Sequence, residues 1–228
     1  MIFTKGTAQE QIDMLLLHYK ELKISAKTDD LYTLQGWILV NRVFNDFTVC
    51  KRYEVEINIP IESDRLPYIR ELSGAIDKRY PHRYISGELC LETDANIRIR
   101  FLDGFNLLQW MEEYVELYFF SYEYYKVYGI FPFGERGHGI QGVLETYGEI
   151  FGEKDPKKIL SMMQFVLFKG YRGHLMCPCG SGRKLRNCHG GIILKFMDDI
   201  RLKNMLQNDF KFIEREVMKY GGQHRNPK

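Results

Sequence analysis

Four side chains able to bind a metal lie close together in the last third of the chain. A Cys-x-Cys pair, an eight-residue loop rich in glycine and basic residues, and a Cys-His pair supply Cys177, Cys179, Cys188 and His189. Three thiolates and one imidazole complete the tetrahedral shell that zinc prefers. Because four protein ligands leave no coordination position for an activated water, the pattern predicts a structural zinc and not a catalytic one. A redox dithiol or a chance cluster is the alternative, and cysteines as close as the first two are poor disulfide partners.

The same stretch is similar to a known zinc motif. From Met176 to Gly190, nearly every position resembles the SEC-C motif, a short zinc tail found at the end of the preprotein translocase ATPase and on many other bacterial proteins. The last pair of that motif is Cys-Cys or Cys-His, and this chain has the Cys-His form. The resemblance implies a small tail, with its motif at residues 177–190, that folds around the metal.

An isolated cysteine between two leucines is the second candidate for chemistry. Cys90 follows Pro81, which fixes one backbone angle, and Gly87, which permits positive φ, so the chain can turn back and present the thiol at a rigid rim. This setting suits a nucleophile. The alternative is a small buried hydrophobic residue, which is what most isolated cysteines are. Cys50 lies in no motif, and for it the second interpretation holds.

The surroundings of Cys90 resemble those of the catalytic cysteine in ubiquitin-conjugating enzymes. That family has a His-Pro-Asn tripeptide whose asparagine lies eight residues before the cysteine, in a Gly-x-Ile-Cys-Leu context. Here Tyr80-Pro81-His82 and Gly87-Glu88-Leu89-Cys90-Leu91 have the same spacing, and Leu66-Pro67 lies near the position of the family's Tyr-Pro. The resemblance covers roughly residues 8–128. It departs from the family at Tyr80 and His82, which replace the histidine and the asparagine.

This resemblance implies an activity for Cys90. The thiol would accept a ubiquitin-like modifier from an activating enzyme and pass it to an amine of a target protein. His82 would take the role of the asparagine, by donating a hydrogen bond or by handling protons. Several bacterial proteins of this type look like parts of antiphage defence. In the alternative hypothesis the domain is an inactive relative, and the protein is a zinc-bearing adaptor that contacts protein or nucleic acid.

The elements before Cys90 are predicted from apolar spacing and turn residues. Thr7 and Glu10 form a capping box for a helix of about four turns. Residues 31–40 and 41–51 have the pattern of two short strands, and residues 53–59 alternate as a strand with one buried face that ends at Pro60. Residues 61–89 predict a last short strand or an irregular crossing. A helix followed by an antiparallel meander and more helices is an α+β fold, and this order is that of the ubiquitin-conjugating fold.

The elements after Cys90 are predicted to be mainly helical. Residues 97–100 alternate like a strand, and Asp103 is a candidate cap for a long aromatic helix over residues 104–128. A glycine-rich loop then carries His138, which could approach the cysteine. Three further helical segments are predicted at residues 140–151, 156–168 and 192–220, the second opened by Asp155-Pro156. We therefore divide the chain into a conjugating-like domain, residues 1–153, and a helical zinc tail, residues 154–228.

Charge and composition restrict the partners. Residues 156–197 contain no acidic side chain and eight cations, so the tail is predicted to have a basic surface that contacts an acidic protein or RNA. The alternative is that these cations are solvated side chains near a thiolate cluster. No apolar run approaches the ~20 residues of a membrane span, and the first residues lack the pattern of a secretion signal. The sequence thus predicts a cytoplasmic protein with no membrane partner.

Overall fold

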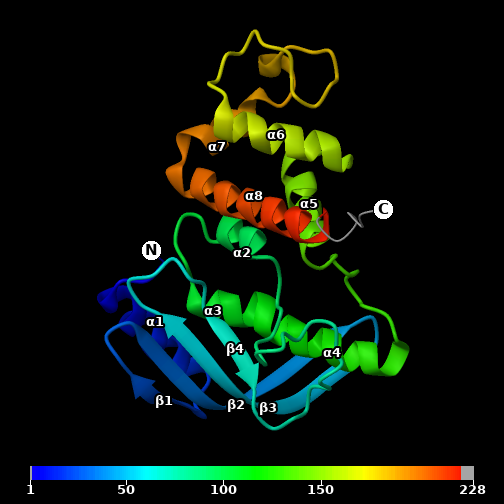
Figure 1. The fold of residues 1–228 in the computed structure, drawn as a ribbon. Helices are drawn as coiled ribbons and strands as arrows, with labels where there is room; N and C mark the ends of the chain where they lie inside the picture. Colours follow the sequence, from blue (N-terminus) through cyan, green and yellow to red (C-terminus); the bar gives the residue numbers. More distant parts are fainter. Residues whose placement is uncertain (1, 222–228) are drawn as a thin grey trace, which may run out of the picture. The chain divides into compact units, whose positions relative to one another are not determined.

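The structure, a computed structural model, describes residues 2–221 of the chain. Its packing divides the chain into two compact units, Met1–Glu135 and Arg136–Lys228. The first unit contains all the strands of the described residues, and the second contains helices and an irregular loop (Figure 1).

An antiparallel sheet forms the centre of the first unit. Its four strands lie in the order β1-β2-β3-β4, and each strand pairs with the next one along the chain. This arrangement is a meander, in which short connections join neighbouring strands. The elements up to the last strand are α1 (Lys5–His18), β1 (Leu22–Lys27), β2 (Leu31–Phe44), β3 (Phe47–Pro60) and β4 (Tyr68–Glu71).

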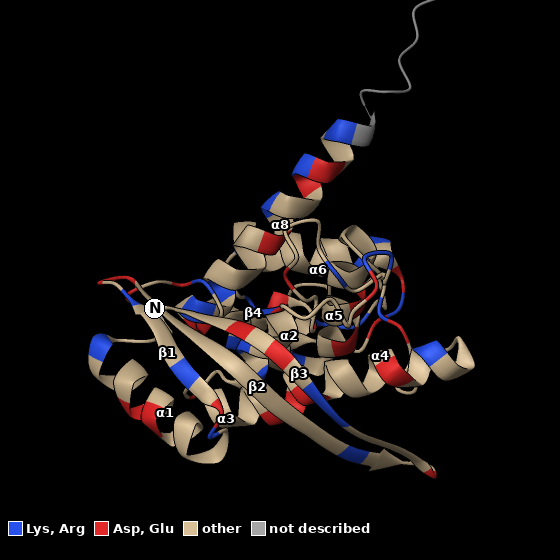
Figure 2. Ribbon diagram, turned by 90° about the horizontal axis from the view of Figure 1, so that it is seen from below, with Lys and Arg blue, Asp and Glu red and all other residues tan. Residues whose placement is uncertain are grey.

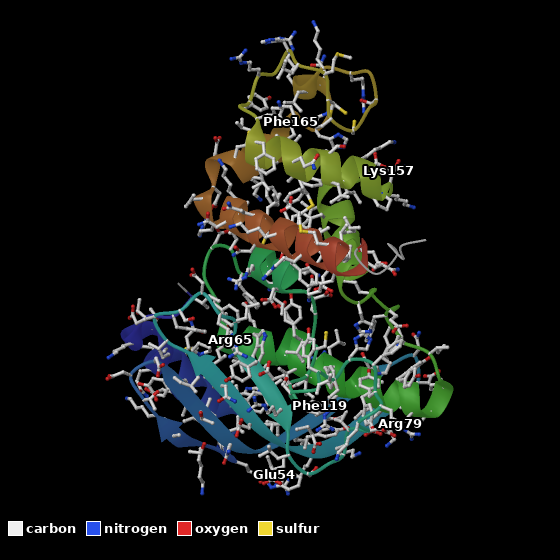
Figure 3. The ribbon with its side chains drawn as sticks, viewed as in Figure 1. Glu54, Arg65, Arg79, Phe119, Lys157 and Phe165 are labelled. Carbon is white, nitrogen blue, oxygen red and sulfur yellow. The ribbon has the colours of Figure 1, made fainter. Side chains whose placement is uncertain are left out.

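Helices cover one face of this sheet. Helix α4 packs on β2 and β3, and α1 packs on α3 (Figure 1). In the core between them the ring of Phe119, which is labelled in Figure 3, stacks on the ring of Tyr53 at a centroid distance of 4.0 Å. The helical elements after the sheet are α2 (Asp94–Arg100), α3 (Leu107–Trp110), the π-helical turn η1 (Met111–Val115) and α4 (Glu116–Tyr128).

The other face of the sheet carries charged side chains. Along β3, the residues that alternate with the buried Tyr53, Val55 and Ile57 are charged, which gives the strand its bands of colour in Figure 2. The predicted alternation is therefore confirmed over residues 53–57, because a strand with one buried face exposes every second side chain, but it ends at Asn58, which is buried.

The long hairpin β2–β3 differs from the predicted strands. We expected a break between residues 40 and 41, but β2 continues to Phe44 and pairs with β3 without interruption. The turn lies at Asn45 and Asp46, whose φ angles are 45° and 64°. Asn and Asp are the residues that tolerate this left-handed conformation best after glycine, and a two-residue turn needs it at both positions.

Three local predictions in the first unit are wrong. Helix α1 is capped by Thr4, with the Thr7 hydroxyl completing the capping box, so Glu10 has no part in it. Residues 97–100 are helical because Thr93 caps α2 and accepts a hydrogen bond from the amide of Asn96. Asn106, and not Asp103, caps α3, accepting from the amide of Gln109 at 2.9 Å. In each case a side-chain oxygen of a threonine or an asparagine accepts a hydrogen bond from a free amide of the first helical turn.

The second unit contains four helices in its described part, and the predictions for them are confirmed. Asp155 caps α6, accepting from the amide of Lys157 at 2.9 Å, with Pro156 at the first helical position. A loop and a short 3-10 turn connect α6 to α7. The elements are α5 (Ile140–Phe151), α6 (Pro156–Phe168), η2 (Leu185–Asn187), α7 (Gly190–Asp198) and α8 (Ile200–Gly221).

Helix α5 belongs with the zinc tail in its packing. It contacts α6 and α8, where the Tyr147 hydroxyl donates to the Asp209 carboxylate at 2.9 Å. The predicted division at residues 153 and 154 would instead place α5 in the first domain. Across the described residues, no helix has both the length and the apolar character needed to cross a lipid bilayer.

Candidate metal centre and cysteine site

The four predicted metal ligands come together in the second unit. Cys177 and Cys179 are buried, and Cys188 and His189 are half-buried. The ligand atoms of all four residues lie within 4.8 Å of one another. The closest pairs are Cys177 Sγ to His189 Nδ1 at 3.3 Å, Cys188 Sγ to the same nitrogen at 3.3 Å, and Cys179 Sγ to Cys188 Sγ at 3.6 Å.

These distances fit the edges of a metal tetrahedron. With Zn–S near 2.3 Å and Zn–N near 2.0 Å, tetrahedral geometry places two sulfurs about 3.8 Å apart and a sulfur and a nitrogen about 3.5 Å apart. A disulfide would need its sulfurs at about 2.0 Å. The cluster is therefore compatible with a bound metal ion, and at 3.6 Å the sulfurs of Cys179 and Cys188 are not joined as a disulfide. His189 would bind the metal through Nδ1.

Local backbone structure holds the ligands in place. The Cys177 amide donates to the Arg183 carbonyl at 2.9 Å, and the Cys188 amide donates to the Leu185 carbonyl at 3.0 Å. His189 then immediately precedes α7, so the start of that helix fixes the last ligand. The loop between the two pairs of ligands is thus tied at both ends.

Hydrogen bonds to sulfur favour a thiolate at Cys179. Burial raises the pKa of this thiol, but donors from the side chain and backbone of Ser181, and from Cys177 and Cys188, outweigh burial, and the pKa is lowered to about 6. At Cys177 burial dominates and raises the pKa to about 11. The Arg183 guanidinium lies 3.3 Å from Cys188 Sγ. Because metal binding requires deprotonated sulfur, donors of this kind prepare the site for a cation.

Cys90 lies at the end of a small hairpin in the first unit. Arg83 and Leu89 pair as an isolated antiparallel bridge, and Gly87, with φ of 85°, makes the turn between them. As a result the Cys90 amide donates to the His82 carbonyl at 2.8 Å. The Tyr118 hydroxyl, from α4, donates to the same carbonyl at 3.0 Å.

The His82 side chain lies near the thiol. A ring nitrogen of His82 is within 4.8 Å of Cys90 Sγ. The imidazole packs edge-on against Phe131, with ring centroids 4.9 Å apart, and Nε2 lies 3.8 Å from the Glu135 carboxylate. The predicted pair Cys90 and His82 is therefore brought together within one unit. His138 belongs to the second unit, and its predicted approach to the cysteine stays a prediction.

The surroundings of Cys90 raise the pKa of its thiol. Burial raises the pKa of the thiol above its usual range, the Tyr84 hydroxyl opposes this with a hydrogen bond, and the charges of Glu92 and Asp94 raise the pKa further. The thiol therefore holds its proton at neutral pH. It borders a pocket of about 270 Å³ whose wall includes Tyr84 and Asp94. Cys50 is exposed on β3, so the expectation that it is a small buried hydrophobic residue is wrong.

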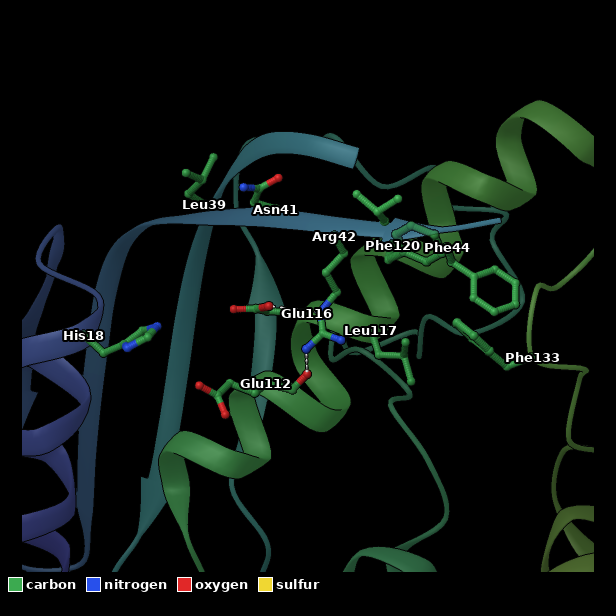
Figure 4. A pocket seen from close by; sticks show the side chains of 11 residues that line it. His18, Leu39, Asn41, Arg42, Phe44, Glu112, Glu116, Leu117, Phe120 and Phe133 are labelled. Atoms are coloured by element: carbon green, nitrogen blue, oxygen red, sulfur yellow. Dashed lines mark hydrogen bonds and ion pairs between the residues drawn. The ribbon is translucent and has the colours of Figure 1, made fainter. Parts of the chain in front are cut away.

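A larger cavity, of about 780 Å³, lies elsewhere in the first unit (Figure 4). Arg42 of β2 crosses it to reach Glu116 at 3.0 Å and the backbone carbonyl of Glu112. The Tyr19 hydroxyl donates to the same Glu116 carboxylate at 2.6 Å. These bonds tie α1 and β2 to the helices, and Cys90 is not part of this cavity's wall.

Sequence reasoning missed Tyr84 and Tyr118 beside Cys90. Neither tyrosine stands in the tripeptide or in the cysteine segment. The position of Tyr84, six residues before the cysteine in a glycine turn, was a usable signal. Tyr118 had none, because only the packing of α4 brings it to the His82 carbonyl.

Comparison with known proteins bears on the metal centre alone. Residues 176–191 match the SEC-C motif. No curated protein and no solved structure matches the chain. The motif agrees with the Cys and His cluster in the structure, and the other residues of the chain are assigned to no family.

Proposed function

We propose that the first unit accepts a ubiquitin-like modifier on Cys90 as a thioester and transfers it to an amine of a target protein. The observation that carries this proposal is the bond from the Cys90 amide to the His82 carbonyl, with the His82 ring within 4.8 Å of the thiol. In the chain, the segment with His82 and Cys90 comes after a helix and a four-stranded antiparallel meander. This is the element order of the ubiquitin-conjugating fold that the chain resembles.

The rim around Cys90 suits contact with a second protein. Tyr84 is 54% exposed and Ile85 is fully exposed, both on the hairpin that ends at the cysteine. An apolar pair at the edge of a reactive group gives a partner an anchor. The activating enzyme must place its own thioester within bonding distance of Cys90 Sγ, so the cysteine has to lie where another protein can reach it.

The chemistry consists of two exchanges at one carbonyl carbon. In the first, Cys90 sulfur attacks the thioester of the activating enzyme, a new C–S bond forms, and the enzyme's C–S bond breaks. The proton of Cys90 goes to the departing thiolate. In the second, the target amine attacks, a C–N bond forms, the bond to Cys90 breaks, and an amine proton goes to the Cys90 thiolate.

Side chains beside the cysteine have defined roles in these steps. Because the Cys90 pKa is raised, the thiol must lose its proton as it attacks, and His82 carries the nearest imidazole of the first unit. The Tyr84 hydroxyl donates to the sulfur and so stabilises the thiolate that leaves in the second step. Tyr118 and the Cys90 amide together fix the His82 backbone.

In the second unit, we assign zinc to Cys177, Cys179, Cys188 and His189. The donor set and the 3.3–3.6 Å edges support this metal. The ion would hold the loop between α6 and α7 in one conformation. Since the protein supplies all four ligands, the zinc has a structural role and offers a fixed surface for a target or partner.

A second function is favoured by the raised pKa of Cys90 and by the loss of the asparagine at His82. Both features suit a non-catalytic relative whose zinc unit acts as an adaptor. The two hypotheses differ at Cys90. Replacement by serine abolishes the activity in the first and has no effect in the second, whereas replacement of Cys177 removes the metal in both.

The test uses Cys90→Ser as a trap in the cell that makes the protein. If the proposal is correct, wild-type protein isolated under non-reducing conditions carries an adduct that thiols remove. Cys90→Ser carries an oxygen ester with the same added mass, which thiols leave intact and mild base removes. The reason is that a serine ester is less reactive toward sulfur and amines than a thioester is. Cys50→Ser, a cysteine change outside the site, keeps the wild-type behaviour. No adduct on either form refutes the proposal.

A further inference from the structure

Two segments of the zinc loop lie side by side in the second unit. The Leu185 amide donates to the Leu175 carbonyl at 2.7 Å, and the Arg186 amide donates to the Gly173 carbonyl at 3.1 Å. Met176 and Lys184 form an antiparallel bridge next to these bonds. Residues 172–176 and 184–186 are therefore held together through their backbones as a short irregular ribbon, in which Leu185 and Arg186 belong to the 3-10 turn η2.

The side chains of this ribbon separate by face. Leu185 is fully buried, while its neighbours Lys184 and Arg186 are exposed. Arg172 and Met176 are exposed on the partner segment. Arg186 lies across Gly173, since a β-carbon on that glycine would be 3.2 Å from the β-carbon of Arg186. Three cations therefore project from adjacent positions, and we call Arg172, Lys184 and Arg186 the basic ribbon.

The basic ribbon has no acidic counterpart nearby in the sequence. Residues 156–197 contain no aspartate or glutamate. Two other cations of this unit already have partners, since Lys158 pairs with Glu153 at 3.4 Å and Arg183 contacts Cys188 Sγ. Within the described residues, the three ribbon side chains have no carboxylate partner. They are free to neutralise charge on another molecule.

We propose that the basic ribbon binds the phosphodiester backbone of a nucleic acid. Three exposed cations that backbone contacts hold close together, without a carboxylate partner among the described residues, match a ligand whose charges repeat along a chain. An acidic protein would need an apolar anchor to bind well, and Met176 is the one large apolar side chain exposed on the ribbon. Backbone contacts position a nucleic acid without reading its sequence.

The number of phosphate contacts determines how strongly the affinity for nucleic acid depends on salt. Each phosphate contact on a single strand contributes about −0.7 to the slope of log K against log salt. Three contacts predict a slope of about −2.1, which is a loss in affinity of about 20-fold between about 50 and 200 mM salt. The ribbon contributes this slope independently of Cys90.

The test measures binding by the zinc-loaded full chain to a fluorescein-labelled oligouridine of about 20 nucleotides, by anisotropy. The double variant Lys184→Gln/Arg186→Gln is expected to reduce the slope by about 1.4 and the affinity at low salt by about tenfold. The matched control, Lys157→Gln/Lys195→Gln, removes two exposed lysines outside the ribbon, one of them labelled on α6 in Figure 3, and is expected to change the affinity less than twofold.

Several outcomes would overturn the proposal. These are no binding by the wild type at about 50 mM salt, an equal loss in both double variants, or a slope unchanged by the ribbon variant. Ribbon-dependent binding to a polyglutamate peptide with none to nucleic acid would assign the surface to an acidic protein instead. Oligothymidine and duplex arms identify the strand type, and ribbon-dependent binding of either supports the proposal. If the double variant loses its zinc, Arg172→Gln replaces it.

Discussion

Replacing Gly190 by alanine tests how closely the ligand loop is packed. Gly190 is a buried residue at the start of α7, directly after His189. A β-carbon at this position would lie 2.6 Å from the Leu185 carbonyl oxygen and 2.9 Å from the Tyr171 hydroxyl. Because the closer contact is with backbone, no side-chain rotation relieves it, and the loop that carries Cys188 has to move.

The expected size of the effect follows from two opposing contributions. Overpacking of a buried position costs about 1–3 kcal/mol, and the better helix propensity of alanine offsets at most about 1 kcal/mol of it. The two contributions together allow a net cost of about 0–3 kcal/mol, and we expect Gly190→Ala to lower the free energy of unfolding by about 1–2 kcal/mol, near the middle of that range. For a unit of this size, 1 kcal/mol corresponds to about 4–8 °C in Tm, so the transition should fall by about 4–16 °C.

The neighbouring glycine provides the matched control. A β-carbon on Gly191 meets nothing within 4 Å, and the residue is exposed in the same helix. Gly191→Ala should therefore leave the protein unchanged or stabilise it by about 0.4–1 kcal/mol. Circular dichroism of the zinc-loaded full chain measures both, and the transition that a chelator shifts reports on the second unit. Equal Tm values for the two variants, or a more stable Gly190→Ala, would refute the packing that places His189.

Three more predictions concern single side chains. Because burial raises the pKa of Cys90, its alkylation by iodoacetamide, followed by peptide mass spectrometry, should accelerate mainly above pH 9. Tyr84→Phe removes the hydrogen bond that lowers this pKa and should move the pH profile of alkylation to higher pH. A profile centred below pH 8 would contradict the account. Glu71→Gln should lower the free energy of unfolding of the first unit, measured with urea, by about 1–3 kcal/mol. The reason is that the buried Glu71 carboxylate accepts a hydrogen bond from the Ser73 amide at 2.8 Å. An equal effect of Glu54→Gln, on the outer face of the sheet, would argue against this. Cys177→Ser should reduce zinc from one ion per chain to a small fraction in elemental analysis, and retention of a full equivalent would exclude Cys177 as a ligand.

The metal cluster was predictable because its signal is local. Cys177, Cys179, Cys188 and His189 lie within one short loop, so their types and spacing already define the shell, and the structure brings all four together. Helix α6 was predictable for the same reason, because Asp155 is a favourable N-cap and Pro156 is favourable at the first helical position. Turn and cap residues act over a few positions, and the sequence displays them directly.

Other features depended on competition that the sequence does not resolve. Residues 97–100 alternate in hydropathy, yet the cap at Thr93 made them helical. The break expected after Val40 was absent because the strand pairing continued to the Asn45-Asp46 turn, where the backbone could adopt positive φ. Thr4, and not Thr7, caps α1 because the Thr4 hydroxyl accepts a hydrogen bond from the Thr7 amide and the Thr7 hydroxyl accepts one from the Thr4 amide.

The cysteine site required tertiary structure. The sequence placed His82 and Cys90 eight residues apart, and the hairpin at Gly87 converts that spacing into a hydrogen bond. The hydroxyl of Tyr118 comes from a helix far along the chain, and no spacing rule reveals it. Burial of Cys90, which raises its pKa, is likewise a property of the folded chain.

The most direct test of the central claim is the intact mass of Cys90→Ser isolated from the cell that makes the protein, before and after thiol treatment and mild base. The account predicts an added mass, equal to that of one modifier, that resists thiols and is removed by base, with a thiol-labile counterpart on the wild type. Wild-type and variant proteins that both lack any adduct, from cells in which the zinc site is filled, would contradict it.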